Sequence, residues 1–250
     1  MTEIIIDKRF CGPKDSGNGG YSAGLFASMI DGPAEVTLKS PPPLDAVIEL
    51  RDGSDGTFEA VHGERVIAIA KPAIVEVEAP PCPAPADVRA AHDAFLSNTD
   101  GEHLIPYCFV CGDRRAPGDG LRIFSGPMPD SVLNADFWTP ANDLASEDGL
   151  VRSEFLWAAL DCPSAFTLRD CTGLILLGRI AVIIKSRPKP GDRLVAAAWP
   201  RGREGRKYYS SCALYDQNGA VIAAANATWI ELDDRAMIAK LEADRKEDQP

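Results

Sequence analysis

Apolar and polar residues alternate in short runs along most of the chain. Alternation with a period of two is typical of strands that bury one face. In the first third of the chain, turn residues (Gly, Pro and Asp) separate such runs at 3–10, 35–38, 46–50, 57–61 and 65–77. The pattern predicts one strand before a glycine-rich turn, and then an antiparallel meander.

Two apolar segments rich in small residues predict helices, at 21–30 and 151–168. The second helix follows predicted strands at 121–124 and 131–137. Four more strands follow it, at 174–185, 193–199, 207–215 and 220–232. Both halves thus share one order, in which an apolar helix precedes a long meander. This order favours an α+β fold in which a curved antiparallel sheet wraps a central helix in each half.

A segment rich in proline and alanine, 79–86, separates the halves. It favours a linker, because proline-rich stretches hold an extended backbone. We expect a first module at 1–80 and a linker with a short helix (86–96) and a Cys-x-x-Cys loop at 81–118. A second module is expected at 119–235 and a helical tail at 236–250. The match between Pro41–Asp45 and Pro188–Asp192, each before a strand, supports a duplication.

Charge and composition limit the classes of binding partner and the cellular location. The 250 residues carry a formal net charge of -11, which disfavours binding to nucleic acid phosphates. No apolar stretch is long enough to span a bilayer, and the first residues do not resemble a signal peptide. Seven cysteines at irregular spacing do not resemble a secreted disulfide framework. We therefore expect a cytoplasmic protein.

The candidate chemistry lies around the two predicted helices. Asn18-Gly19-Gly20 precedes the first, and Asp161 stands within the apolar second helix, two turns after Glu154. With these residues the chain resembles the hotdog-fold superfamily of acyl-CoA thioesterases and dehydratases, as two fused modules forming a pseudo-dimer. In thioesterases of that superfamily, an Asn-His-Gly-Gly motif is followed by an aspartate seven residues later.

The resemblance implies a divided motif. The first half keeps the glycines but has Ala27 at the acid position, whereas the second half keeps Asp161 but has Glu154 at the glycine position. One composite site would survive, in which the Gly20 N–H polarises a thioester carbonyl and Asp161 activates water or attacks. Asn18 and Gly19 belong to the same motif. Thr228 lies near the position of a water-orienting polar residue in fused thioesterases of the superfamily.

Each of these residues also has a purely structural explanation, which stays open. Gly19 and Gly20 also suit a flexible turn into a helix. Asp161 also suits a cap at the Cys162-Pro163 break, Glu154 a charge at a helix N-terminus, and Thr228 an ordinary strand position.

Substrate contacts are expected from two sources. Apolar lining, with Tyr21 and Trp157 among it, would suit an acyl tail, and Glu154 would share the cleft. Lys185 and Arg187 belong to a basic cluster that suits the phosphates of coenzyme A. A solvated hairpin explains the same basic cluster equally well.

Cys108 and Cys111 form a Cys-x-x-Cys pair. A structural zinc site needs four ligands; His103 offers a third, and no second cysteine pair stands at a suitable spacing. The sequence therefore favours a turn with two ordinary thiols, with no metal and no cofactor.

The sequence thus predicts an acyl-CoA thioester hydrolase. The alternative is a protein that binds acyl-CoA or an acyl chain without catalysis. A hotdog hydratase or dehydratase is disfavoured, because none of the three histidines lies near either predicted central helix. The exposed outer face of the sheet also leaves open a homo-oligomer.

Overall fold

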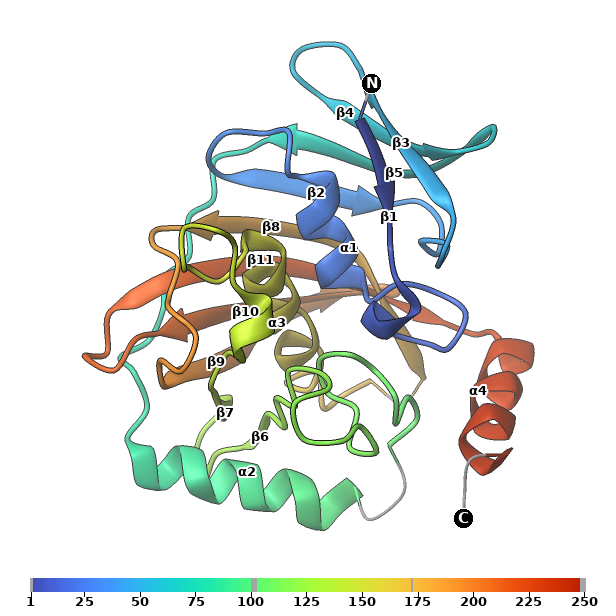
Figure 1. Ribbon diagram of the computed structural model, residues 1–250. Coiled ribbons are helices and arrows are strands. Elements are labelled where there is room, and N and C mark those ends of the chain that lie inside the picture. The colour runs from blue at the N-terminus through green and yellow to red at the C-terminus, as the bar shows by residue number, and fades with distance from the viewer. Residues whose placement is uncertain (1, 100–102, 172, 248–250) are drawn as a thin grey trace.

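The computed structural model describes residues 2–99, 103–171 and 173–247. Within them, one antiparallel sheet of 11 strands curves around two central helices (Figure 1). The strand order is β1-β3-β4-β5-β2-β8-β11-β10-β9-β7-β6. The strands of each half of the chain therefore stay together, and the halves meet at β2 and β8.

The first half contributes five strands: β1 (Thr2–Ile5), β2 (Ala34–Leu38), β3 (Val47–Asp52), β4 (Phe58–His62) and β5 (Arg65–Pro72). The second half contributes six: β6 (Gly126–Pro127), β7 (Asn134–Trp138), β8 (Leu174–Ile184), β9 (Leu194–Glu204), β10 (Lys207–Tyr215) and β11 (Val221–Leu232). The helices are α1 (Gly19–Phe26), α2 (Pro85–Thr99), α3 (Ser153–Ala165) and α4 (Arg235–Glu247), with 3-10 turns η1 (Lys8–Phe10) and η2 (Asn142–Leu144). None of these helices is long and apolar enough to cross a membrane.

The two halves share one continuous sheet. β2 pairs antiparallel with β8, with Ala34 opposite Val182 and Thr37 opposite Arg179. Val36 and Ile180 form one pair of this ladder, and both are fully buried. The joint thus places apolar side chains in the common core, where each buried residue of this size stabilises the fold by about 1.5–3 kcal/mol.

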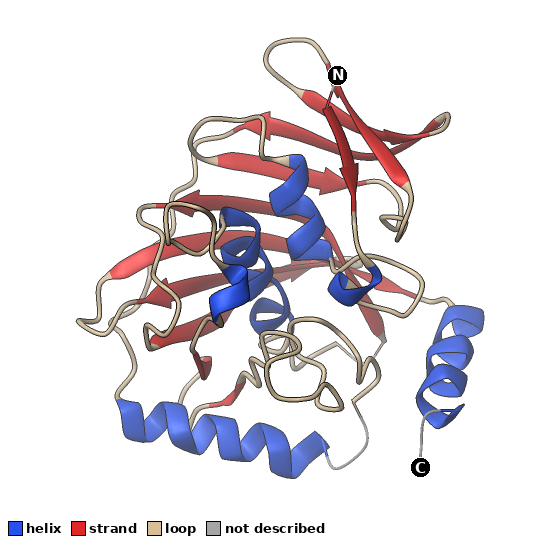
Figure 2. Ribbon diagram, viewed as in Figure 1, coloured by secondary structure: helices blue, strands red, loops and turns tan. Residues whose placement is uncertain are grey.

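Helices α1 and α3 pack against each other inside the curve of the sheet (Figure 2). Small residues on α1 make the approach close. A Cβ at Gly20 would lie 2.7 Å from the Trp157 carbonyl oxygen, and a Cβ at Gly24 would lie 2.6 Å from the Glu154 Cα. Both distances are too short for a side chain, so glycine at these two positions sets the helix spacing.

Local hydrogen bonds explain where several elements differ from the expected ranges. α1 begins at Gly19 rather than Tyr21, because the Asn18 side chain caps it by accepting from the Tyr21 N–H at 2.9 Å. The strand expected at 3–10 ends at Ile5 and gives way to η1. The strand expected at 121–124 is absent: Arg122 has a φ of 53°, and the Phe124 N–H donates to the Asp136 side chain.

The alternative of a helix break at Cys162-Pro163 is not observed, and the helix expected at 151–168 runs through this position. α3 runs through Pro163 to Ala165, so Asp161 lies within the helix and caps no break. Proline in a helix forgoes one backbone hydrogen bond, but here burial of almost the whole helix among apolar neighbours outweighs that loss.

The segment expected to be a linker, 81–118, contains α2, which packs against β6 and β7. A Cβ at Gly126 in β6 would lie 1.9 Å from the Ala91 carbonyl oxygen, so helix and strand are in close contact. The His92 ring is also hydrogen-bonded to Asp136, at 2.9 Å. Residues 100–102 of this segment and residues 248–250 of the expected tail lie outside the described residues. The division into modules at these boundaries remains a prediction.

Candidate functional site

A cavity of about 630 Å³ lies where the two halves meet. Its wall includes the loop before α1, the C-terminal part of α3 and the ends of β2, β8 and β11 nearest to them. The lining is mostly apolar, and its segments are 12–13, 16–19, 38–42, 103–105, 108, 111, 161–162, 165–166, 173–178, 229–230, 232 and 237. Such a cavity is large enough for an extended apolar ligand.

Asp161 is the one carboxylate among the described residues that line this wall, and it is 2% exposed. Its Oδ2 accepts from the Gly20 N–H at 2.8 Å and from the Asn18 side-chain amide at 3.0 Å. Its Oδ1 is buried without a hydrogen-bond partner among the described residues. One oxygen of the carboxylate is therefore anchored at the N-terminus of α1, and the other is free to accept a proton.

Burial governs the ionisation of Asp161. Removal from water raises its pKa to about 7, and the nearby Cys108 acts in the same direction. The hydrogen bonds from Gly20 and Asn18 act oppositely, because they stabilise the ionised form. A carboxyl with a pKa near neutrality suits proton transfer at physiological pH.

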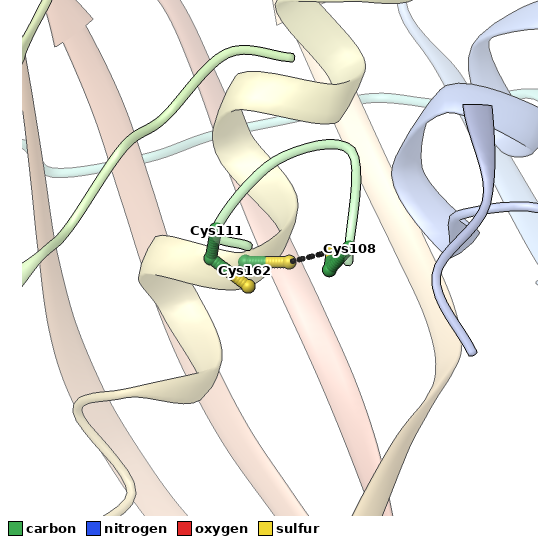
Figure 3. Close-up of side chains that lie close together, drawn as sticks. All are labelled: Cys108, Cys111 and Cys162. Atoms are coloured by element: carbon green, nitrogen blue, oxygen red, sulfur yellow. Dashed lines mark hydrogen bonds between the residues drawn. The ribbon is translucent and has the colours of Figure 1, made fainter. Parts of the chain in front are cut away.

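Three cysteines stand beside Asp161 in the cavity wall. Cys108 and Cys111 come from the loop after α2, and Cys162 from α3 (Figure 3). The Cys108 and Cys162 Sγ atoms are 3.7 Å apart, and the Asn18 amide nitrogen lies 3.8 Å from each. Hydrogen bonds from Cys111 and then Cys162 hold the pKa of the Cys108 thiol well below its usual value.

The structure brings together one group of the residues proposed from sequence. Asn18, Gly19 and Asp161 all line the cavity, although 143 positions separate Asn18 from Asp161. Gly20 lies behind them with its N–H directed to Asp161. The expectation that the Gly20 N–H faces a substrate carbonyl therefore needs correction, because this donor is already in use.

Tyr21 and Trp157 were expected to contact substrate, but both are core residues that do not line the cavity. The Tyr21 ring stacks on Phe10 with a centroid distance of 4.2 Å and also contacts Phe155. Trp157 lies against Gly24, where α1 and α3 cross. The packing of α1 against α3 buries both side chains in the core, which is why neither reaches the cavity.

Thr228 faces away from the cavity. It is partly exposed on β11, opposite Tyr209 and Arg179, whereas the neighbouring Trp229 is buried and lines the cavity. Side chains alternate across a strand, so the Thr228 side chain does not reach the cavity, which corrects the expectation that it orients water there. Trp229 is fixed by its indole N–H, which donates to the Ser164 hydroxyl at 3.0 Å.

Lys185 and Arg187 stand far from the cavity. Gly178 is the last residue of β8 in the lining, and Lys185 lies seven positions further, roughly 23 Å at the strand rise. Arg187 pairs instead with Asp148. Glu154 is also outside the lining and pairs with Arg152 at 3.3 Å.

Sequence reasoning missed three parts of the site. Cys162 joins the Cys108–Cys111 pair, and residues 174–178 of β8 supply much of the apolar wall. His103 also lines the cavity, which corrects the expectation that no histidine lies near a central helix. The one available signal was Cys162 directly after Asp161, on the helix already singled out.

Comparison with solved structures identifies the fold. A conserved protein of unknown function with a hot dog fold from Alicyclobacillus acidocaldarius superposes with a TM-score of 0.58 at 14% identity, covering 93% of each chain. An acyl-CoA thioesterase II, TesB2, from Mycobacterium marinum gives 0.58 at 11% identity, covering 94% of this chain and 93% of its own. The tesB protein of Mycobacterium avium subs paratuberculosis gives 0.52 at 12% identity, covering 86% and 87%.

No protein-family model matches the sequence, and no curated protein matches it either. At these identities the structural likeness establishes the fold alone. It confirms the α+β double hotdog architecture expected from the two helix-and-meander patterns.

Proposed function

We propose that the protein hydrolyses an acyl thioester, of the acyl-CoA class, in the cavity between its two halves. The observation that carries this proposal is the state of Asp161: one oxygen is anchored by Gly20 and Asn18, and the other is buried, unpartnered and at the cavity wall. The thioesterases among the structural neighbours support the choice of substrate class.

In this proposal Asp161 acts as general base. Its Oδ1 takes a proton from a water molecule as that water attacks the thioester carbonyl. The C–S bond then breaks, the departing thiolate takes the proton from Asp161, and the free acid and the thiol are released. General-base catalysis of this kind contributes roughly 10²–10⁴-fold in rate.

The Gly19 N–H is the better candidate to polarise the carbonyl. Gly19 is the first residue of α1 and lines the cavity, and no acceptor for its N–H is found among the described residues. The first N–H groups of a helix have no partner within it and carry partial positive charge. Gly20 then has a positioning role, since its N–H holds Asp161.

The rest of the cavity suits a thioester with an apolar acyl group. Residues 174–177 of β8 and Trp229 form an apolar wall, while the exposed Lys39 offers a cation for a phosphate at the edge. Lys185 and Arg187 do not enter this proposal, because they lie at the other end of β8.

The test is a panel of acyl-CoA esters of increasing chain length, incubated with the wild type and Asp161→Asn, with products separated by liquid chromatography and identified by mass. We expect release of coenzyme A and free acid by the wild type, and at least a ~100-fold lower rate for the variant. Binding of a non-hydrolysable thioether analogue without turnover of any ester would favour the alternative, a binding protein. Hydration of an enoyl-CoA instead would favour a hydratase.

A further inference from the structure

We propose that Cys108, Cys111 and Cys162 form a zinc site, with three thiolate ligands and a fourth position open to the cavity. The three Sγ atoms lie within 4.8 Å of one another. Figure 3 shows the side chains converging from the loop after α2 and from α3. This site goes beyond the proposed hydrolysis and does not depend on it.

The spacing of the sulfur atoms fits the metal. Zinc binds thiolate at about 2.3 Å in a tetrahedral arrangement, which puts neighbouring sulfur atoms about 3.8 Å apart. The Cys108 and Cys162 Sγ atoms are already 3.7 Å apart. All three cysteines are free thiols. The Cys111 Sγ lies within 4.8 Å of both, so a shift of about 1 Å or less in each of its sulfur–sulfur distances would allow three equal bonds.

The loop is shaped to hold its two cysteines together. The Gly112 N–H donates to the Cys108 carbonyl oxygen at 2.8 Å and closes a tight turn. A Cβ at Gly112 would lie 2.5 Å from the carbonyl oxygens of both Cys108 and Pro106, so the turn requires glycine. Cys162 is brought to this turn by α3, whose position is fixed by its packing on α1.

The surroundings suit a site that carries negative charge. Three thiolates and Zn²⁺ have a net charge of -1, and all three cysteines must be deprotonated to bind the metal. The Asn18 side-chain amide lies 3.8 Å from the sulfur atoms of Cys108 and Cys162 and donates toward them. Such donors around a metal site orient its ligands and stabilise their charge.

His103 supplies a second, independent observation. Its Nε2 is buried and has no partner among the described residues. Its Nδ1 accepts from the Ile105 N–H at 3.0 Å, so the neutral ring carries its proton on Nε2. This nitrogen is thus a donor without an acceptor at the cavity wall, and an anionic metal–thiolate group would supply the acceptor. While Nδ1 accepts this hydrogen bond, Nε2 has no lone pair to offer the metal.

The test uses Co²⁺ as a spectroscopic probe in zinc-free, fully reduced protein. We expect one equivalent to bind, with the sulfur-to-cobalt charge-transfer band and the intense visible bands of tetrahedral Co²⁺, and Zn²⁺ should displace it. Cys108→Ser and Cys162→Ser should each weaken binding at least 10-fold, whereas the matched control Cys171→Ser should keep the wild-type spectrum. Absence of stoichiometric binding by the wild type, or an equal loss in the control, would overturn the site.

Two further measurements test the fourth position. Azide should shift the visible bands, because it replaces an exchangeable ligand on the cavity side. His103→Gln should retain one equivalent of Co²⁺ with tetrahedral bands. A spectrum insensitive to azide, or loss of the metal in the His103 variant, would contradict the open position. Because all these readouts are spectroscopic, they hold whether or not the protein hydrolyses thioesters.

Discussion

The two ends of the α1–α3 pair are alike in packing and different in chemistry. At one end Gly20 lies against Asp161, and at the other Gly24 lies against Glu154. Asp161 is 2% exposed and holds an unpartnered oxygen at a cavity wall. The Glu154 side chain is 16% exposed and pairs with Arg152.

The difference shows that close helix packing alone does not make a site. Both ends need a glycine because the two helix backbones approach closely. Only the Asp161 end combines a buried carboxylate, a capped helix N-terminus and a cavity. Glu154 keeps partial access to solvent and has an arginine partner, and ion pairs of this kind contribute little to stability.

The largest expected effect is on stability, and it tests whether the two ends of the α1–α3 pair are packed equally closely. Gly20→Ala would place a Cβ 2.4 Å from the Asp161 Cβ, and Gly24→Ala would place one 2.6 Å from the Glu154 Cα. We expect each variant to lower the free energy of unfolding by about 2 kcal/mol or more, measured by urea denaturation. Gly12→Ala is the control, because its Cβ would meet no atom closer than 3.4 Å. If either helix variant behaves like the control, the described helix contact is wrong.

A substitution inside the cavity tests the difference between the ends. Ala165 lines the cavity one turn beyond Asp161, and Ala165→Trp would fill part of its volume. We expect the Kd for a long-chain acyl-CoA analogue to rise about 10-fold, equivalent to ~1.4 kcal/mol, and that for a short-chain analogue to change less. Calorimetric titration gives both values. The control Val132→Trp, at a position 65% exposed, should change neither Kd. An equal rise in Kd for the two variants would show that the acyl group does not bind in this cavity.

A smaller effect concerns α2, which packs near the Asp161 end. There the Phe95 ring meets Phe166, just after α3, edge to face at 5.0 Å. The hydrogen bond to Asp136 raises the pKa of His92 above its usual value. The His92–Asp136 pair therefore stabilises the fold fully below the pKa of His92 in the unfolded chain, about 6.5. This stabilisation is lost as the pH rises through the higher pKa of His92 in the folded protein.

We accordingly expect His92→Gln to cost about 1 kcal/mol of unfolding free energy at pH 5.5 and less at pH 8.5, as measured by urea denaturation. His62→Gln, at an exposed histidine, serves as the control. A cost for His92→Gln that grows with pH would contradict the assigned pair.

The sequence predicted those features that depend on local pattern. Alternation located ten of the strands approximately, including β10 at its observed bounds, and missed the two-residue β6. The joining of Asn18, Gly19 and Asp161 came from a motif that spans both halves. The predictions that failed depend on tertiary geometry. The sequence does not show which face of β11 turns inward at Thr228, or which end of β8 reaches the cavity. The contact of Cys162 with Cys108, 54 positions earlier, leaves no periodic signal.

In the proposed mechanism one end of the helix pair, at Asp161, is chemically active, and the other, at Glu154, is not. The most direct test of this claim compares kcat/KM for Asp161→Asn and Glu154→Gln on the best acyl-CoA ester, with unfolding measured in parallel. Asp161→Asn keeps an acceptor for the Gly20 N–H, so the fold should survive. We predict at least a ~100-fold loss of kcat/KM for Asp161→Asn and less than about 2-fold for Glu154→Gln. Equal losses in the two variants, or full activity without the Asp161 carboxylate, would contradict the claim.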